Sequence, residues 1–242
     1  MRANFSGESF LLAGEHSGAV FAGIDLTAGP RRPTACALLD SEARLIRLGK
    51  CRRDEDIVAF VRKARIAGVD APCSLPLGLH VCCMADRPLC GCRQVNPFAG
   101  RQAERDLLKE GIRAYILSKN TFAKAWVRRG LLLKSRLERA GIRVLEVYPT
   151  GAKVRLFGRP EEKKSTRAGR SWLQSRLKAW VAGLPSPREG LLSHDALDAI
   201  LAALSVWFYA MDVAEAVGDP REGQIWLPKS KLRPEDVLLP SL

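Results

Sequence analysis

The chain has 242 residues, of which 47% are hydrophobic and 27% charged, a composition typical of a globular protein with a sizeable core. Its apolar runs are too short to span a bilayer, and its first 17 residues lack the pattern of a secretory signal. We therefore exclude a membrane protein and expect a cytoplasmic chain whose seven cysteines stay reduced or bind metal.

Positive charge is concentrated in one part of the chain. The formal net charge is +13, and residues 119–178 alone carry 17 Lys or Arg against 4 Asp or Glu. A basic segment on a balanced body is typical of a protein that binds a polyanion such as nucleic acid. A solvated basic surface explains the same numbers equally well, so charge alone does not decide between the two.

The first half of the chain predicts three hairpin-connected strands, a helix and a fourth strand. Apolar and alternating runs place these strands at 20–26, 34–40, 44–51 and 66–69. The helix is expected over 54–65, with Asp54 placed to cap it. Residues 72–100, rich in proline, glycine and cysteine, interrupt this pattern and predict a long functional loop.

The second half is mainly helical. A fifth strand is expected over 142–147, and a basic loop over 159–170. Gly141 is expected to end the helix before that strand. An extended piece over 223–228 closes the domain. Helices are expected at 102–110, 121–140, 171–181 and 195–217.

This order of elements predicts a ribonuclease H-like α/β domain. Its mixed five-stranded sheet, an antiparallel meander plus parallel strands, would be flanked by helices. Right-handed crossovers would set the fourth and fifth strands parallel to the first, with their carboxyl ends at one edge. We expect an N-terminal extension over 1–18, the domain over 19–230 with the Cys-rich loop inserted at 72–100, and a C-terminal tail over 231–242.

Acidic residues stand where several of these elements begin or end. Asp25 and Asp70 end the first and fourth strands, Glu146 lies on the fifth, and Asp195 and Asp198 open the last helix one turn apart. Buried acids are costly when unpaired, so their convergence favours catalytic Mg²⁺ or Mn²⁺, which prefer carboxylate ligands. Taken singly, each acid has an ordinary explanation, such as a solvated helix face, a helix-start charge or, for Glu146, an arginine partner.

Five ordered stretches resemble uncharacterised-domain family 429, which is described as a predicted nuclease with a ribonuclease H fold. The likeness covers roughly residues 21–228, and the stretches read GIDLTAGPRRPTACALL, VDAPCSLP, RQAERDLLKEGI, RGLLLKSRLERAGIRVLEVYPTGA and SHDALDAILAAL. The motif HDALDA is also similar to the terminal acidic helix of RuvC-type junction resolvases. That likeness implies Asp25, Asp195 and Asp198 as metal ligands, and it hints at a catalytic role for His194. The resolvases carry a glutamate near the place of Asp70. His194 is equally well explained as a helix-start residue.

Two further groups of residues are candidate sites. Cys82, Cys83, Cys90 and Cys92 crowd into eleven residues and could hold Zn²⁺, although their spacing departs from paired CxxC motifs and equally fits a reduced, thiol-rich loop. Basic residues could instead contact nucleic-acid phosphates. These candidate contacts are Arg101, Arg105, Lys153, Lys163, Lys164, Arg167 and Arg170. Arg101 and Arg105 could also be surface charges paired with Glu104 or Asp106, and Lys153 could belong to an ordinary strand-to-helix turn.

These features predict a metal-dependent nuclease that hydrolyses nucleic-acid phosphodiesters by a two-metal carboxylate mechanism. The alternative is a non-catalytic nucleic-acid-binding protein that keeps the same fold and charge. A phosphotransferase is disfavoured because the sequence has no GxxxxGK[ST] phosphate loop. The choice between DNA and RNA stays open.

Overall fold

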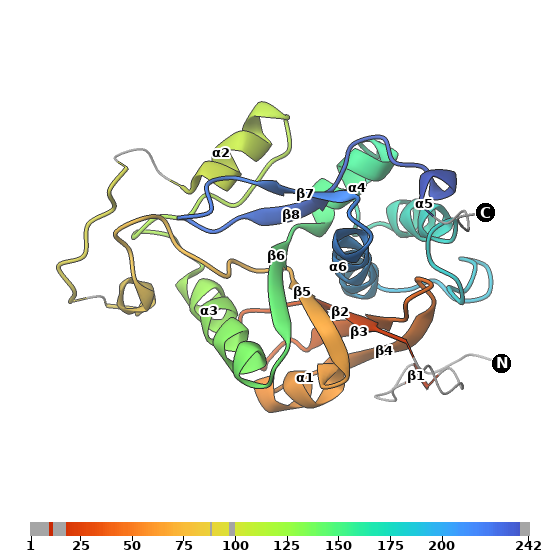
Figure 1. Cartoon of the computed structure of the whole chain (residues 1–242), viewed down its shortest axis with the longest axis horizontal. Coiled ribbons are helices and arrows are strands. Elements are labelled where there is room, and N and C mark those ends of the chain that lie inside the picture. Colours follow the sequence, from red (N-terminus) through yellow and green to blue (C-terminus); the bar gives the residue numbers. More distant parts are fainter. Residues whose placement is uncertain (1–9, 12–17, 88, 97–99, 238–242) are drawn as a thin grey trace.

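The computed structural model describes residues 10–11, 18–87, 89–96 and 100–237, which form a mixed sheet with helices on both faces (Figure 1). The strand order is β1-β4-β3-β2-β5-β6-β8-β7. No helix in the described ranges is both long and apolar enough to cross a bilayer. The strands are β1 (Phe10–Leu11), β2 (Val20–Asp25), β3 (Thr34–Leu39), β4 (Leu45–Cys51), β5 (Ala64–Val69), β6 (Arg143–Val147), β7 (Ala214–Val217) and β8 (Ile225–Pro228). The helices are α1 (Asp54–Val61), α2 (Gln102–Lys109), α3 (Lys124–Arg139), α4 (Pro149–Phe157), α5 (Arg167–Leu177) and α6 (His194–Ala210), with 3-10 turns η1 (Val81–Met84) and η2 (Pro234–Asp236).

The centre of the sheet follows the predicted plan. Strands β2, β3 and β4 form the antiparallel meander, and β5 and β6 run parallel to β2. The prediction of an α/β mixed sheet is therefore confirmed. Gly141, with a φ of +81°, follows the end of α3 as expected.

The prediction of five strands was wrong, because three short strands extend both edges of the sheet. Strand β1 pairs with β4 although it lies inside the predicted N-terminal extension, most of which falls outside the described residues. The helix predicted over 195–217 ends at Ala210, and Asp212 has a φ of +58° that reverses the chain into β7. Strand β7 then pairs with β8, which itself pairs in parallel with β6.

Other elements also differ from those expected. The helix expected over 54–65 ends at Val61, because Ala64 already begins β5. Helix α4, with Pro149 at its start, was not predicted. The basic loop predicted over 159–170 is shorter, since α5 begins at Arg167 and the hydroxyl of Thr166 accepts the Gly169 N–H at 3.0 Å to cap it.

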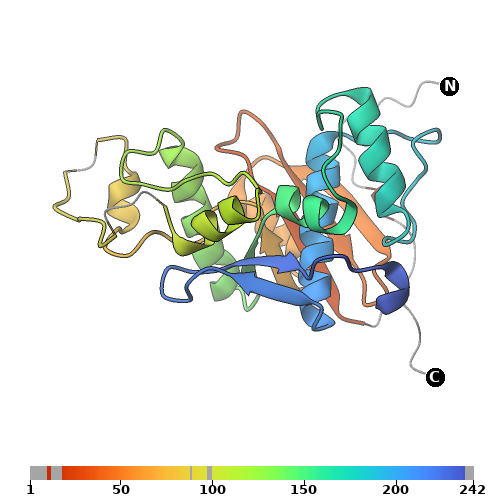
Figure 2. The same ribbon diagram turned by 90° about the horizontal axis from the view of Figure 1, so that it is seen from above.

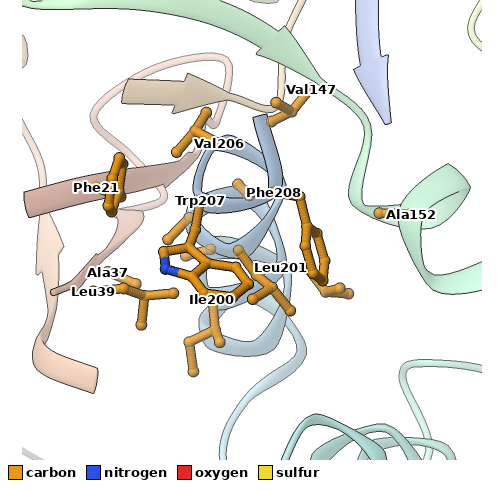
Figure 3. Close-up of a cluster of buried hydrophobic side chains, with 14 of the residues drawn as sticks. Phe21, Ala37, Leu39, Val147, Ala152, Ile200, Leu201, Val206, Trp207 and Phe208 are labelled. Carbon is orange, nitrogen blue, oxygen red and sulfur yellow. The ribbon is translucent and has the colours of Figure 1, made fainter. Parts of the chain in front are cut away.

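Helix α6 packs very closely on the middle of the sheet. A Cβ at Gly23 of β2 would lie 2.0 Å from the Ala199 carbonyl oxygen of α6, and a Cβ at Gly68 of β5 would lie 2.6 Å from that of Ala202. Two residues without side chains thus allow the helix to approach the sheet. Figure 3 shows Trp207 and Phe208 of α6 in the core, with side chains of β2, β3 and β6 around the helix. Helices α1 and α3 cover the opposite face.

Candidate active site and thiol cluster

The parallel pairing of β2 and β5 sets Asp25 and Asp70 beside each other. Ile24 pairs with Val69, and the N–H of Asp70 donates to the Ile24 carbonyl at 2.9 Å. Both acids therefore leave the same edge of the sheet, at the carboxyl ends of their strands.

Helix α6 brings the other two aspartates to this edge. Ser193 caps the helix by accepting the N–H of Ala196, so Asp195 and Asp198 lie in its first two turns. Asp198 is only 2% exposed. Because the glycines under α6 let it approach β2, Asp195 and Asp198 come within electrostatic range of Asp25.

Burial and the close approach of these acids shift the pKa values of Asp25 and Asp70 in a direction that disfavours their ionised forms. Burial, followed by the charges of Asp198 and Asp195, raises the pKa of Asp25 from 3.8 to about 8. Burial and the neighbouring charge of Asp25 also raise the pKa of Asp70 well above its ordinary value. Such shifts are typical of acids that serve a functional site.

Two lysines offset part of this negative charge. The Lys164 ammonium donates to Asp198 Oδ2 at 2.6 Å, and the charge of Asp198 raises the pKa of Lys164 against the opposing effect of burial. Lys153, on α4, is 6% exposed. Burial lowers the pKa of its ammonium, and the nearby charge of Asp198 acts in the opposite direction. Both were expected to contact phosphate, and the structure places both next to the carboxylates.

Glu146 is committed to a buried ion pair. Arg101 Nη2 and Nη1 donate to its two carboxylate oxygens at 2.5 and 2.8 Å, and the Cys73 N–H donates to Oε2 at 2.7 Å. Arg101 Nε also donates to Glu104 at 2.8 Å. Glu146 is therefore paired with an arginine, which was the alternative to metal binding for this residue.

The structure does not place Arg101 where it could clamp a phosphate. Arg101 is 1% exposed, so no donor remains at the surface. Arg105 is partly buried and donates to the Gly100 carbonyl and to the Gln102 side chain, with Glu222 as its acidic neighbour at 3.8 Å. Both arginines therefore serve the packing of α2.

The remaining sequence candidates lie on or beside α5 and at the start of α6. Lys163 and Arg167 are exposed at the start of α5, and Arg170 donates to the Leu192 carbonyl at 3.3 Å. His194 Nε2 lies 2.9 Å from Asp195 Oδ1. This contact ties the imidazole to one of the four aspartates.

Sequence reasoning missed two residues beside the acids. Tyr148, whose pKa is raised by burial and by the nearby charge of Asp70, lines a cavity of about 40 Å³ together with Asp70 and Glu146. Ser74 accepts from Arg101 Nη1 at 2.6 Å. Both lie within stretches quoted above, Tyr148 in VLEVYPTGA and Ser74 in VDAPCSLP, which was the signal available for finding them.

A family model described as "Protein of unknown function (DUF429)" matches residues 23–223, which include all of these acids. The chain belongs to the DUF429 family. The expected resemblance is thereby confirmed. Among solved structures, the DUF429 chain is similar to the Thermus thermophilus RuvC structure at 13% identity, with a TM-score of 0.37 and coverage of 80% of this chain and 96% of that one. A search of curated proteins found no match.

The Cys-rich loop of this DUF429 chain gathers its four thiols into one cluster. Cys82 and Cys83 come from η1, Cys90 and Cys92 from the returning chain, and their sulfurs all lie within 4.8 Å of one another. Among the described residues, no group of three or more carboxylates is gathered as closely. The thiol cluster could therefore hold a metal ion. Cys36 lies apart, buried in β3.

Proposed function

We propose that this chain is a metal-dependent nuclease that hydrolyses nucleic-acid phosphodiester bonds at the carboxylate site. The observation that carries the proposal is the approach of acids from β2, β5 and α6, where burial and the charges of neighbouring acids raise the pKa values of Asp25 and Asp70. Such a group is expensive to keep ionised without a cation. A divalent ion would supply the positive charge that these acids lack.

The donor set fits Mg²⁺ or Mn²⁺. Asp25, Asp70, Asp195 and Asp198 offer only hard carboxylate oxygens, which these ions prefer. Glu146 is not included, because both its oxygens already accept from Arg101. One or two divalent ions held by the aspartates would supply a Lewis acid that stabilises negative charge on a reacting phosphodiester. The thiols, by contrast, suit a soft metal such as zinc in a structural role.

The chain's own residues would bind the substrate and move a proton. Lys164, at 45% side-chain exposure, can turn from Asp198 to a phosphate oxygen, while the buried Lys153 stays as a fixed positive charge. Lys163 and Arg167 would hold the backbone further out. His194, whose Nε2 lies 2.9 Å from Asp195 Oδ1, would give a proton to the leaving oxygen.

A cleavage screen tests the proposal. Single-stranded, duplex and branched DNA and RNA are incubated with the protein in Mg²⁺ or Mn²⁺, alongside Asp198→Asn and the control Asp106→Asn on α2. We expect at least one substrate to be cut by wild type and control, with a loss of at least about 100-fold in Asp198→Asn. Equal activity in Asp198→Asn would overturn the assignment.

One contact favours the alternative, a nucleic-acid-binding protein without catalysis. The 2.6 Å ion pair with Lys164 already neutralises Asp198 without any metal. A non-catalytic protein would bind nucleic acid, cut none of the substrates, and gain no thermal stability from Mn²⁺. A nuclease would gain stability from Mn²⁺ even before its substrate is found.

A further inference from the structure

The four sulfur atoms of the Cys-rich loop lie within 4.8 Å of one another, and two of their separations match the edge of a metal-thiolate tetrahedron. The Cys83 and Cys90 sulfurs are 3.5 Å apart, and those of Cys82 and Cys92 are 3.7 Å apart. Zinc bonds thiolates at about 2.3 Å, and a tetrahedron with that radius has edges of about 3.8 Å. A disulfide needs about 2.05 Å, so the arrangement is that of four separate ligands.

Groups around the sulfurs suit thiolates. The Lys119 ammonium donates to the carbonyls of both Cys90 and Cys92 at 2.9 Å, which fixes this arm of the loop and puts a positive charge beside it. The His80 N–H donates to Cys83 Sγ at 3.5 Å. Bound thiolates carry excess negative charge, and these donors offset part of it.

The loop needs such a link, because it has little core of its own. It projects from the body of the protein (Figure 2, yellow). Three of its residues, Leu79, Cys83 and Met84, form a small buried cluster with Leu117 and Val127 from outside the loop. Nearby, Leu89 is fully exposed and Val95 is 70% exposed. Small units of this kind commonly depend on a metal or a disulfide for their stability.

We propose that Cys82, Cys83, Cys90 and Cys92 bind one Zn²⁺ in a closed structural site, separate from the carboxylates. Four protein ligands leave no open position, so the ion stabilises the fold and takes no part in a reaction. Its effect reaches the neighbouring elements through the same loop. The loop starts beside Asp70 and ends at Arg101, and its Cys73 N–H and Ser74 hydroxyl contact the Arg101–Glu146 pair.

Metal analysis is the first test. Protein made in zinc-containing medium and purified with reductant but without chelator should carry about one Zn²⁺ per chain. Exchange for Co²⁺ should give thiolate-to-cobalt charge-transfer bands and the visible bands of a tetrahedral ion. Protein without metal, protein with octahedral cobalt bands, or iron in place of zinc would overturn the proposal.

Matched cysteine variants locate the site. Cys83→Ser and Cys92→Ser should lose the bound zinc, whereas the control Cys51→Ser, far from the cluster, should keep it. Chelation of wild type should speed amide exchange in residues 72–96 while β2 and β5 stay protected. Zinc retained in both cluster variants, or exchange unchanged on chelation, contradicts the assignment. These readouts need no cleavage activity, so they stand apart from the proposed nuclease function.

Discussion

The substitution Asp25→Asn tests how much the ionised carboxylates lower the free energy of unfolding. The pKa of Asp25 rises from 3.8 to about 8 in the folded chain, through burial first and then the charges of Asp198 and Asp195. Between these values the folded chain holds a proton that the unfolded chain has released. The free energy of unfolding of the wild type should therefore fall as pH rises from about 4 to about 8, and then level off.

The size of the effect follows from the pKa difference. Each pH unit corresponds to about 1.36 kcal/mol, so a difference of about 4 gives an upper limit of about 6 kcal/mol. Asp25 is not fully buried, so solvent screening reduces the effect, and a measured difference of about 2–4 kcal/mol is expected. Asparagine cannot ionise. Asp25→Asn should therefore match wild type near pH 4 and exceed it by this amount at pH 9.

Urea unfolding followed by tryptophan fluorescence measures the difference. Both proteins are unfolded in EDTA at pH 5, 7 and 9, and again with Mn²⁺, which should stabilise wild type but not Asp25→Asn. The control is Asp236→Asn, because the pKa of Asp236 is lowered by its surface pairing with Arg233. It should show no gain that grows with pH. If Asp25→Asn is less stable than wild type at pH 9 in EDTA, the reasoning about buried charge fails.

Three further outcomes are expected. Glu146→Gln removes one of the two carboxylate partners of the buried Arg101 and should cost about 3–5 kcal/mol in urea unfolding; a loss under about 1 kcal/mol would contradict the buried pair. Gly23→Ala places a Cβ against the backbone of α6 and should destabilise the chain by about 2 kcal/mol or more, measured as a lower melting temperature, whereas an unchanged value would refute the close packing. Replacing Lys163 and Arg167 by Ala should weaken nucleic-acid binding and make its salt slope shallower by about 1.8 in filter-binding titrations; an unchanged slope would mean that both are solvated charges.

Much of the fold could be predicted from sequence because burial imposes local patterns. The apolar runs that became β2, β3 and β5 are buried almost throughout, and such runs are visible without any knowledge of neighbours. The acids at the strand ends could be identified for the same reason, since each follows directly on a buried run. The one-turn spacing of Asp195 and Asp198 likewise placed them together on α6.

Only the tertiary structure decided which residues far apart in the chain contact one another. Strands β7 and β8 have four residues each, too few to show a period, and they exist because β6 offers β8 an open edge. Arg101 meets Glu146 45 residues away, and Lys164 meets Asp198 34 residues away. The thiol cluster also depends on folding, because sulfur-to-sulfur distances follow from how the loop turns back on itself. Charge pairs and ligand geometry depend on distances in space that crossover connections create, and no local pattern of residues encodes those distances.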